Sequence, residues 1–263
     1  MREHYRRNQT PAPASVEENE GQLEGRNALT EALRSGRTID KVFIASGETD
    51  RGLQRLAAQA KEAGAVIVPV DRRKLDAMST THSHQGVIAL AAAREYFTID
   101  DILQTAADRG EEPLIVICDE LSDPHNLGAI LRRAECAGAH GVIIPKRRSV
   151  GLTAVVAKAS AGAVEYMKVA RVTNINAAME ELKQKGVWIF GTAAEGSIPM
   201  YQADLKIPTA IVIGSEGDGM SRLVRQNCDV IVHIPMKGKI TSLNASAAAS
   251  ILLYEAVRQR LEG

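Results

Sequence analysis

The sequence has no long apolar run and only three cysteines. None of its apolar segments approaches the ~18 residues that a membrane-spanning helix needs, and residues 1–22 lack the apolar centre of a secretory signal. The cysteines, Cys118, Cys136 and Cys228, are odd in number and widely spaced, which argues against a disulfide framework or a zinc site. We therefore expect a cytoplasmic protein with no membrane partner, in which each cysteine is a small buried hydrophobic residue.

An excess of charge of either sign is also absent. The 32 basic and 32 acidic side chains give a formal net charge of zero, so a nucleic-acid partner would have to bind a local basic patch. Such a patch is expected between residues 142 and 172, where Glu165 is the single acidic residue and phosphate groups could be neutralised. A solvated charged face is the alternative. The basic residues of this segment are Lys146, Arg147, Arg148, Lys158, Lys168 and Arg171.

A metal site is not expected. His82 and His84 stand close together in THSHQG, but the sequence places no cysteine or carboxylate beside them that would complete a set of ligands.

The 263 residues, 45% of them hydrophobic, can build one large or two ordinary domains. Residues 1–22 are polar and rich in proline and charge, and we expect a flexible tail. In residues 23–93, the apolar runs KVFIAS and AVIVPV flank the helical pattern GLQRLAAQAKEAG, which predicts a βαβ unit in a small α/β domain. Residues 94–112 are charged, contain one short amphipathic helix, and are expected to be a linker.

A larger alternating series fills residues 113–263. Continuous apolar strands interleaved with helices predict an α/β domain with a largely parallel sheet that is covered on both faces. Strands are expected at 114–118, 141–145, 187–191, 209–214 and 230–235, and helices at 127–137, 153–160, 175–185, 222–226 and 243–261.

Ligands bind beyond the carboxyl ends of the strands in such sheets, and the unusual loops of this sequence follow strands. In DPHNLGAILRRAE, Asn126 is expected to cap a helix, and Gly128 to allow another backbone to approach closely. In IGSEGDGM, the order of the glycines fits neither the dinucleotide fingerprint nor the phosphate-binding loop, so neither NAD nor ATP is indicated. In TSLNASAAAS, Ser242 and Asn244 taken alone would be helix caps.

Taken together, the segments DPHNLGAILRRAE, IGSEGDGM and IPMKGKITSLNASAAASILLYE resemble the three signature motifs of the SpoU/TrmH family of RNA ribose 2′-O-methyltransferases, within the SPOUT superfamily. The resemblance covers about 150 residues from Leu114 onward. The stretch from EGRNALTEAL to HQGVIALAAA is similar to the family's small substrate-binding domain, which is itself similar to ribosomal protein L30e. The resemblance implies a deep trefoil knot in the C-terminal SPOUT domain, S-adenosylmethionine as cofactor, and a homodimer.

The resemblance also implies roles for particular residues. Catalytic positions fall on Asn126, Arg132, Glu216, Ser242 and Asn244. Cofactor-binding positions, which act mostly through main-chain groups, fall on Thr192, Gly214, Ile234, Met236 and Leu243. An arginine with a pKa above ~12 is a poor base, so an orienting role for Arg132 is favoured over proton abstraction.

The bacterial enzymes that methylate a guanosine ribose in 23S rRNA are the relatives that this two-domain pattern resembles most. Two alternatives remain open. A tRNA guanosine methyltransferase of the same family would share every catalytic residue, and a ribosome-assembly protein would keep the fold and the RNA binding without catalysis.

Overall fold

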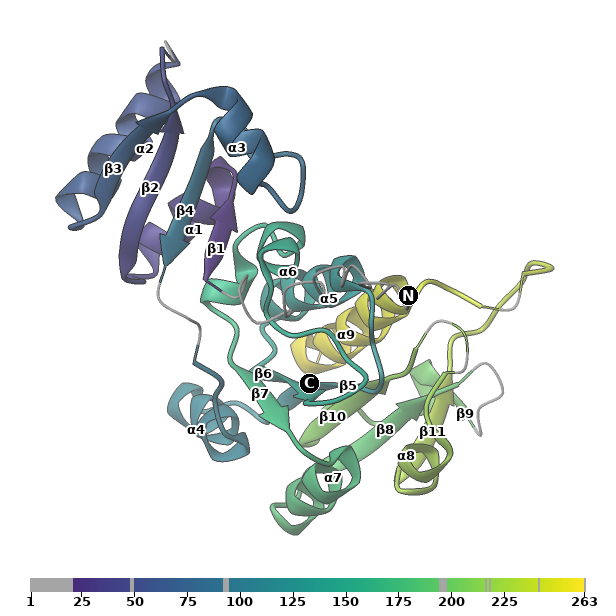
Figure 1. The fold of residues 1–263 in the computed structure, drawn as a ribbon. Coiled ribbons are helices and arrows are strands. Elements are labelled where there is room, and N and C mark those ends of the chain that lie inside the picture. Colours follow the sequence, from purple (N-terminus) through teal and green to yellow (C-terminus); the bar gives the residue numbers. More distant parts are fainter. Residues whose placement is uncertain are drawn as a thin grey trace, which may run out of the picture.

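The computed structural model describes residues 21–47, 50–91, 95–193, 198–215, 217, 219–240 and 242–262, which form two sheets with their helices (Figure 1). The expected tail lies outside these residues except for its last two positions. No helix in the described ranges is long and apolar enough to cross a membrane.

The N-terminal sheet has four strands in the order β1-β4-β2-β3. Strands β2 and β3 are parallel and joined through helix α2, so the predicted βαβ unit is confirmed, while β4 is antiparallel to β2 and β1. Strand β1 was not predicted, because three residues are too few to show a periodic pattern. The elements are β1 (Gln22–Glu24), α1 (Arg26–Arg34), β2 (Ile39–Ala45), α2 (Arg51–Glu62), β3 (Val66–Val70), α3 (Arg72–Met78) and β4 (Val87–Ala91).

The C-terminal sheet has seven strands in the order β7-β6-β5-β10-β8-β11-β9, and every neighbouring pair is parallel. The parallel α/β sheet is therefore confirmed. The sequence analysis missed the two edge strands β7 and β9, since one has four residues and the other has two, one of them a proline. The strands are β5 (Leu114–Cys118), β6 (Gly141–Pro145), β7 (Val169–Val172), β8 (Trp188–Thr192), β9 (Ile198–Pro199), β10 (Thr209–Ile213) and β11 (Val230–His233).

Helices cover both faces of this sheet, as predicted (Figure 1). Alternate residues of the central strand β5 divide between the two layers: Leu114 and Val116 pack with α5, α6 and α9, whereas Ile115 and Ile117 pack with α4, α7 and α8. The helices are α4 (Ile99–Arg109), α5 (Pro124–Cys136), α6 (Ala154–Ala159), α7 (Ile175–Gln184), α8 (Arg222–Gln226) and α9 (Ala245–Leu261). Helix α4, in the segment expected to be a linker, thus packs on the second sheet.

Helices α5 and α6 lie in direct backbone contact at Gly128. A Cβ on this glycine would be 2.5 Å from the Ala159 Cβ and 2.8 Å from the Val156 carbonyl oxygen, so the predicted close approach is confirmed. Helix α6 also contacts β1 of the N-terminal sheet, and the Lys158 ammonium donates to the Thr81 hydroxyl, in the loop between α3 and β4, over 3.1 Å.

The cysteines occupy three different environments. Cys118 is buried, and burial raises the pKa of its thiol to about 12; Cys228 is half-buried. Cys136 is exposed, so the expectation of a buried residue was wrong there. It is the last residue of α5 and lies on the face of that helix that turns away from the core.

Candidate active site

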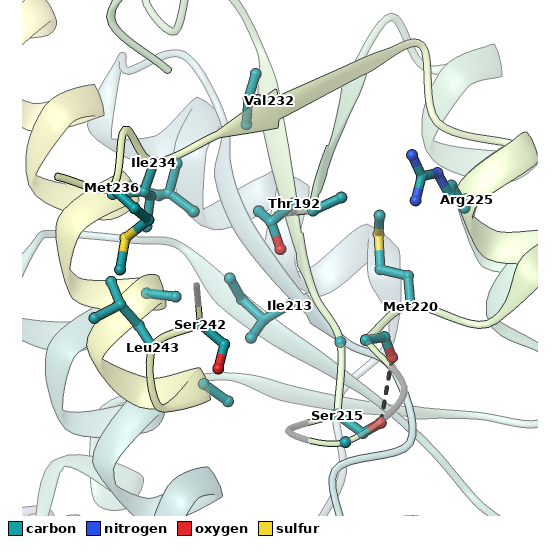
Figure 2. Close-up of a pocket in the computed structure, with 17 residues that line it drawn as sticks. Thr192, Ile213, Ser215, Met220, Arg225, Val232, Ile234, Met236, Ser242 and Leu243 are labelled. Atoms are coloured by element: carbon teal, nitrogen blue, oxygen red, sulfur yellow. Dashed lines mark hydrogen bonds between the residues drawn. The ribbon is translucent and has the colours of Figure 1, made fainter. Parts of the chain in front are cut away.

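A cavity of about 410 Å³ lies at the carboxyl ends of β8, β10 and β11, against the start of α9 (Figure 2). All five positions predicted to bind a cofactor line it, together with Ser242. Its lining is Thr192, Ala193, Ile213, Gly214, Ser215, Gly217, Gly219, Met220, Arg225, Val232, Ile234, Met236, Ser242, Leu243, Ala245, Ala248 and Leu252. We name it the first cavity.

The first cavity is mainly apolar. Figure 2 shows Ile234, Met236 and Leu243 gathered on one side of it, with Met220 and Arg225 on the opposite side. The Thr192 hydroxyl donates to the Val212 carbonyl oxygen over 2.8 Å, so this side chain is bound to the neighbouring strand β10. Among the described lining residues Arg225 is the only cation, which suits a ligand with a flat apolar part and no phosphate group.

One wall of the first cavity is the tight turn after β10. The Ser215 N–H donates to the Gly219 carbonyl oxygen, and the Gly219 N–H to that of Ser215, both over 3.0 Å. A Cβ on Gly214 would lie 2.2 Å from the carbonyl carbon of Gly219 and 2.3 Å from the Met220 nitrogen, so only glycine fits there. Glu216, predicted to be catalytic, lies outside the described residues, and its role stays a prediction.

Asp119 anchors this turn and was missed by the sequence analysis. It directly follows β5, is 3% exposed, and accepts a hydrogen bond of 2.7 Å from the Ser221 N–H through Oδ2. A carboxylate immediately after a central buried strand was the signal available in the sequence.

A second cavity, of about 470 Å³, adjoins the first and shares Ser215 and Gly217 with it. Polar groups dominate this second cavity. It is lined by Glu120, Leu121, Ser122, Asp123, Asn126, Arg148, Ser215 and Gly217.

Asn126 lies in the second cavity and does not cap α5, so that expectation was wrong. The cap is Asp123, whose side chain accepts from the His125 N–H over 2.9 Å, because Pro124 takes the first helical position. Asn126 is therefore inside the first turn, and it is 4% exposed.

Asn244 lines neither cavity but links residues that do: its neighbours Leu243 and Ala245 line the first, and its hydrogen-bond partner Asn126 lines the second. Its Oδ1 caps α9 by accepting from the Ser246 and Ala247 N–H groups over 3.0 and 3.2 Å, as the capping interpretation expected. Its Nδ2 also donates to Asn126 Oδ1 over 2.9 Å, across 118 residues of sequence. The first and third motifs are thus linked by one side-chain amide pair, which satisfies both polar groups.

Arg132, like Asn244, is a predicted catalytic residue that lines neither cavity. Its side chain lies on the exposed side of α5. The six-residue interval from Asn126 turns the two side chains to different faces of the helix.

The expected basic patch is only partly an open surface. Lys168 donates to the Asp101 carbonyl oxygen over 3.0 Å, Arg171 packs 5.1 Å from the centre of the Tyr96 ring, and Lys158 donates to the Thr81 hydroxyl. The exposed part is residues 146–148, the loop after β6.

His84 has a structural role that was not predicted. Its Nε2 lies 2.9 Å from Asp76, and its Nδ1 accepts from the Gly86 N–H over 3.1 Å. In the ranges described, no three histidine, cysteine or carboxylate residues gather as metal ligands would.

A doubly covered parallel sheet with two adjoining cavities beyond the carboxyl ends of its strands is typical of α/β enzymes. The family follows from comparison with known proteins. Residues 113–254 match the SpoU rRNA Methylase family, and residues 22–97 match the domain described as RNA 2′-O ribose methyltransferase substrate binding. The chain belongs to the SpoU/TrmH family of RNA 2′-O-methyltransferases.

Individual relatives agree with this assignment. YacO of Bacillus subtilis (strain 168), which is placed in the TrmH family of tRNA/rRNA methyltransferases, is 49% identical over 236 residues, covering 90% of this chain and 94% of YacO. The 23S rRNA (guanosine-2′-O-)-methyltransferase RlmB of Ralstonia nicotianae is 44% identical over 240 residues, with 90% and 95% covered. The structure of the SpoU methyltransferase AviRb from Streptomyces viridochromogenes, in complex with AdoMet, has a TM-score of 0.78 at 26% identity, with 92% and 91% covered.

Proposed function

We propose that this protein transfers a methyl group from S-adenosylmethionine to the ribose 2′-hydroxyl of a guanosine in 23S rRNA. The observation that carries the proposal is the hydrogen bond from Asn244 to Asn126, which holds the edge of the first cavity against the second. One cavity takes the cofactor and the other the acceptor nucleotide, and the ribose lies at their shared boundary.

The first cavity fits S-adenosylmethionine. Its apolar side chains, Ile234 and Leu243 among them, can pack on an adenine ring, and the main-chain groups of Thr192 and of the turn after Gly214 can bind its polar edge. When bound, this cofactor would supply a methyl group on a sulfonium ion, which passes to a nucleophile in one displacement with the neutral thioether as the leaving group. The described lining offers no set of basic groups for a phosphate, which agrees with a cofactor that has none.

On the acceptor side, Asn126 and Asn244 are proposed to hold the ribose, with Ser242 and Glu216 beside it. Arg132 is exposed and therefore open to RNA. A guanidinium ion keeps its proton near neutral pH, so Arg132 is proposed to bind a phosphate or orient the 2′-hydroxyl, and not to act as the base.

The choice of substrate is supported by the similarity to RlmB, whose name specifies a guanosine in 23S rRNA. The second candidate is a tRNA guanosine, because the name of YacO includes both tRNA and rRNA as substrates. Either RNA would place the reaction in the cytoplasm. A homodimer is also proposed, and the exposed apolar side chains Tyr254 and Leu261 on α9 support it.

Arg132→Ala tests whether Arg132 is needed for methyl transfer but not for cofactor binding. Methyl transfer to RNA should fall by at least about 100-fold, while calorimetry should give a cofactor affinity within about twofold of the wild type, because Arg132 lines neither cavity. Glu135→Ala, an exposed change on the same helix, is the control and should leave both quantities unchanged. A large loss of cofactor affinity in Arg132→Ala would show that the residue is not specific to the acceptor.

A further inference from the structure

Glu120 and Arg148 form an ion pair on the rim of the second cavity. They follow the adjacent strands β5 and β6, their nearest charged atoms are 3.0 Å apart, and their side chains are 39% and 79% exposed. The pair therefore faces both solvent and the cavity that is proposed to hold the acceptor nucleotide.

Both partners have a strained backbone. The φ angles of Glu120 and Arg148 are +55° and +57°, a conformation that residues other than glycine seldom adopt. Such strain persists where the surrounding structure enforces it, and it concentrates at functional sites. An exposed ion pair contributes little to stability, so stabilisation alone is a weak reason to keep two strained residues together.

The position of a carboxylate on the rim of a cavity proposed to bind RNA also requires a chemical explanation. RNA is a polyanion, and a negative side chain beside its binding cavity repels the phosphates. The repulsion is offset where the carboxylate accepts hydrogen bonds from a base. Guanine offers two adjacent donors, N1–H and N2–H, which match the two oxygens of one carboxylate, and its O6 lies next to them as an acceptor.

We propose that the Glu120–Arg148 pair reads the Watson–Crick edge of the target guanine, an inference that rests on the proposed function. The carboxylate of Glu120 accepts from N1–H and N2–H, and the guanidinium of Arg148 donates to O6. Two acceptors and one donor in a row are the pattern that cytosine presents to guanine. Adenine offers an acceptor at N1 and a donor at N6, and uracil offers one donor between two acceptors, so neither base matches the pair.

The dimensions of the site agree with this reading. The second cavity, of about 470 Å³, has room for a nucleoside; Asn126 lines it, and Ser215 and Gly217 are shared with the first cavity. When Glu120 holds the base at the rim, the attached ribose points toward the boundary between the two cavities. The methyl group of the cofactor would reach the ribose there. A base whose Watson–Crick edge is bound by protein side chains has to leave the base stack, so the target guanine must be unstacked to reach this pair.

The test replaces the target guanosine by analogues in an RNA oligonucleotide that spans the methylated position. Inosine lacks the N2 amine, and 7-deazaguanosine changes only N7, which the pair does not contact. With the wild-type enzyme, inosine should lower kcat/KM by about 10- to 100-fold, and 7-deazaguanosine should be methylated like guanosine. In Glu120→Gln, kcat/KM for guanosine should fall and the preference over inosine should shrink to about twofold.

Asp100→Asn is the matched control, because Asp100 pairs with Lys185 in an exposed ion pair remote from both cavities and should keep the full preference. A preference for guanosine over inosine that survives in Glu120→Gln, or a requirement for N7, would overturn the inference while leaving guanosine methylation intact. If no RNA is methylated, the proposed function fails. Titration of the protein with GMP, IMP and AMP, followed by NMR of the nucleotide, then decides the inference alone: selectivity for GMP that is lost in Glu120→Gln supports it, and equal binding overturns it.

Discussion

Asn244 makes two sets of hydrogen bonds in this structure, and different substitutions remove one set or both. Its Oδ1 caps α9, and its Nδ2 donates to the buried Asn126. Loss of an asparagine cap costs about 1 kcal/mol, and loss of a hydrogen bond between neutral groups costs about as much again. Asn244→Ala should therefore lower the free energy of unfolding by about 2 kcal/mol and abolish methyl transfer.

Asn244→Asp keeps the cap of α9 and removes the hydrogen bond to Asn126. Aspartate caps a helix as well as asparagine does, so the loss of stability should be only that of the hydrogen bond to Asn126, about 1 kcal/mol. Its carboxylate cannot donate to Asn126 Oδ1, and it places a negative charge at the boundary of the two cavities. Methyl transfer should thus fall at least about 100-fold in a protein that remains folded.

Urea denaturation and single-turnover methyl transfer measure these two effects. Asn174→Ala is the matched control, because Asn174 caps α7 in the same way, accepting from the Asn176 and Ala177 N–H groups, but no residue of α7 lines either cavity, whereas α9 lines the first. It should lose about 1 kcal/mol of stability and no activity. The reasoning is refuted if Asn244→Asp retains full activity, or if it is as unstable as Asn244→Ala.

Three further predictions concern other parts of the chain. Gly214→Ala should weaken cofactor binding by about 100-fold in calorimetry, because its Cβ forces the turn that ends at Gly219 to move by about 1 Å; unchanged affinity would contradict this. Burial alone would raise the pKa of Glu24, but hydrogen bonds from Ser79, Thr81 and Thr80 lower it from 4.5 to about 2. Its ionised form should thus add about 3 kcal/mol of stability above pH 4.5 that is lost as the pH falls to 2, a dependence that urea denaturation should find missing in Glu24→Gln. Arg260→Met should lower the free energy of unfolding by about 3 kcal/mol, because the guanidinium donates to four carbonyl groups near the end of α9, and a loss below 1 kcal/mol would argue against this anchor.

The strands and helices with strong apolar patterns could be predicted from the sequence, since burial on both faces leaves continuous runs such as LIVIC. The short strands β1, β7 and β9 could not, because their pairing depends on neighbours that are distant in the sequence. The cap of α5 was misplaced by three residues for a related reason: Asp123 and Asn126 are both good caps, and only the position of Pro124 in the helix distinguishes them.

The candidate site could be predicted as a set of positions but not as an arrangement. The resemblance to a family indicated which residues matter, yet the bond between Asn126 and Asn244 and the anchoring role of Asp119 depend on tertiary contacts. The trefoil knot, the division into domains and the role of Glu216 stay predictions.

The central claim is that the chain methylates the ribose of one guanosine in 23S rRNA. Deleting the gene in its host and mapping 2′-O-methyl groups over all rRNA and tRNA tests this most directly. We predict the loss of a single 2′-O-methylguanosine from 23S rRNA, restored by the wild-type gene and not by Arg132→Ala. A loss confined to tRNA, or an unchanged map, would contradict the account.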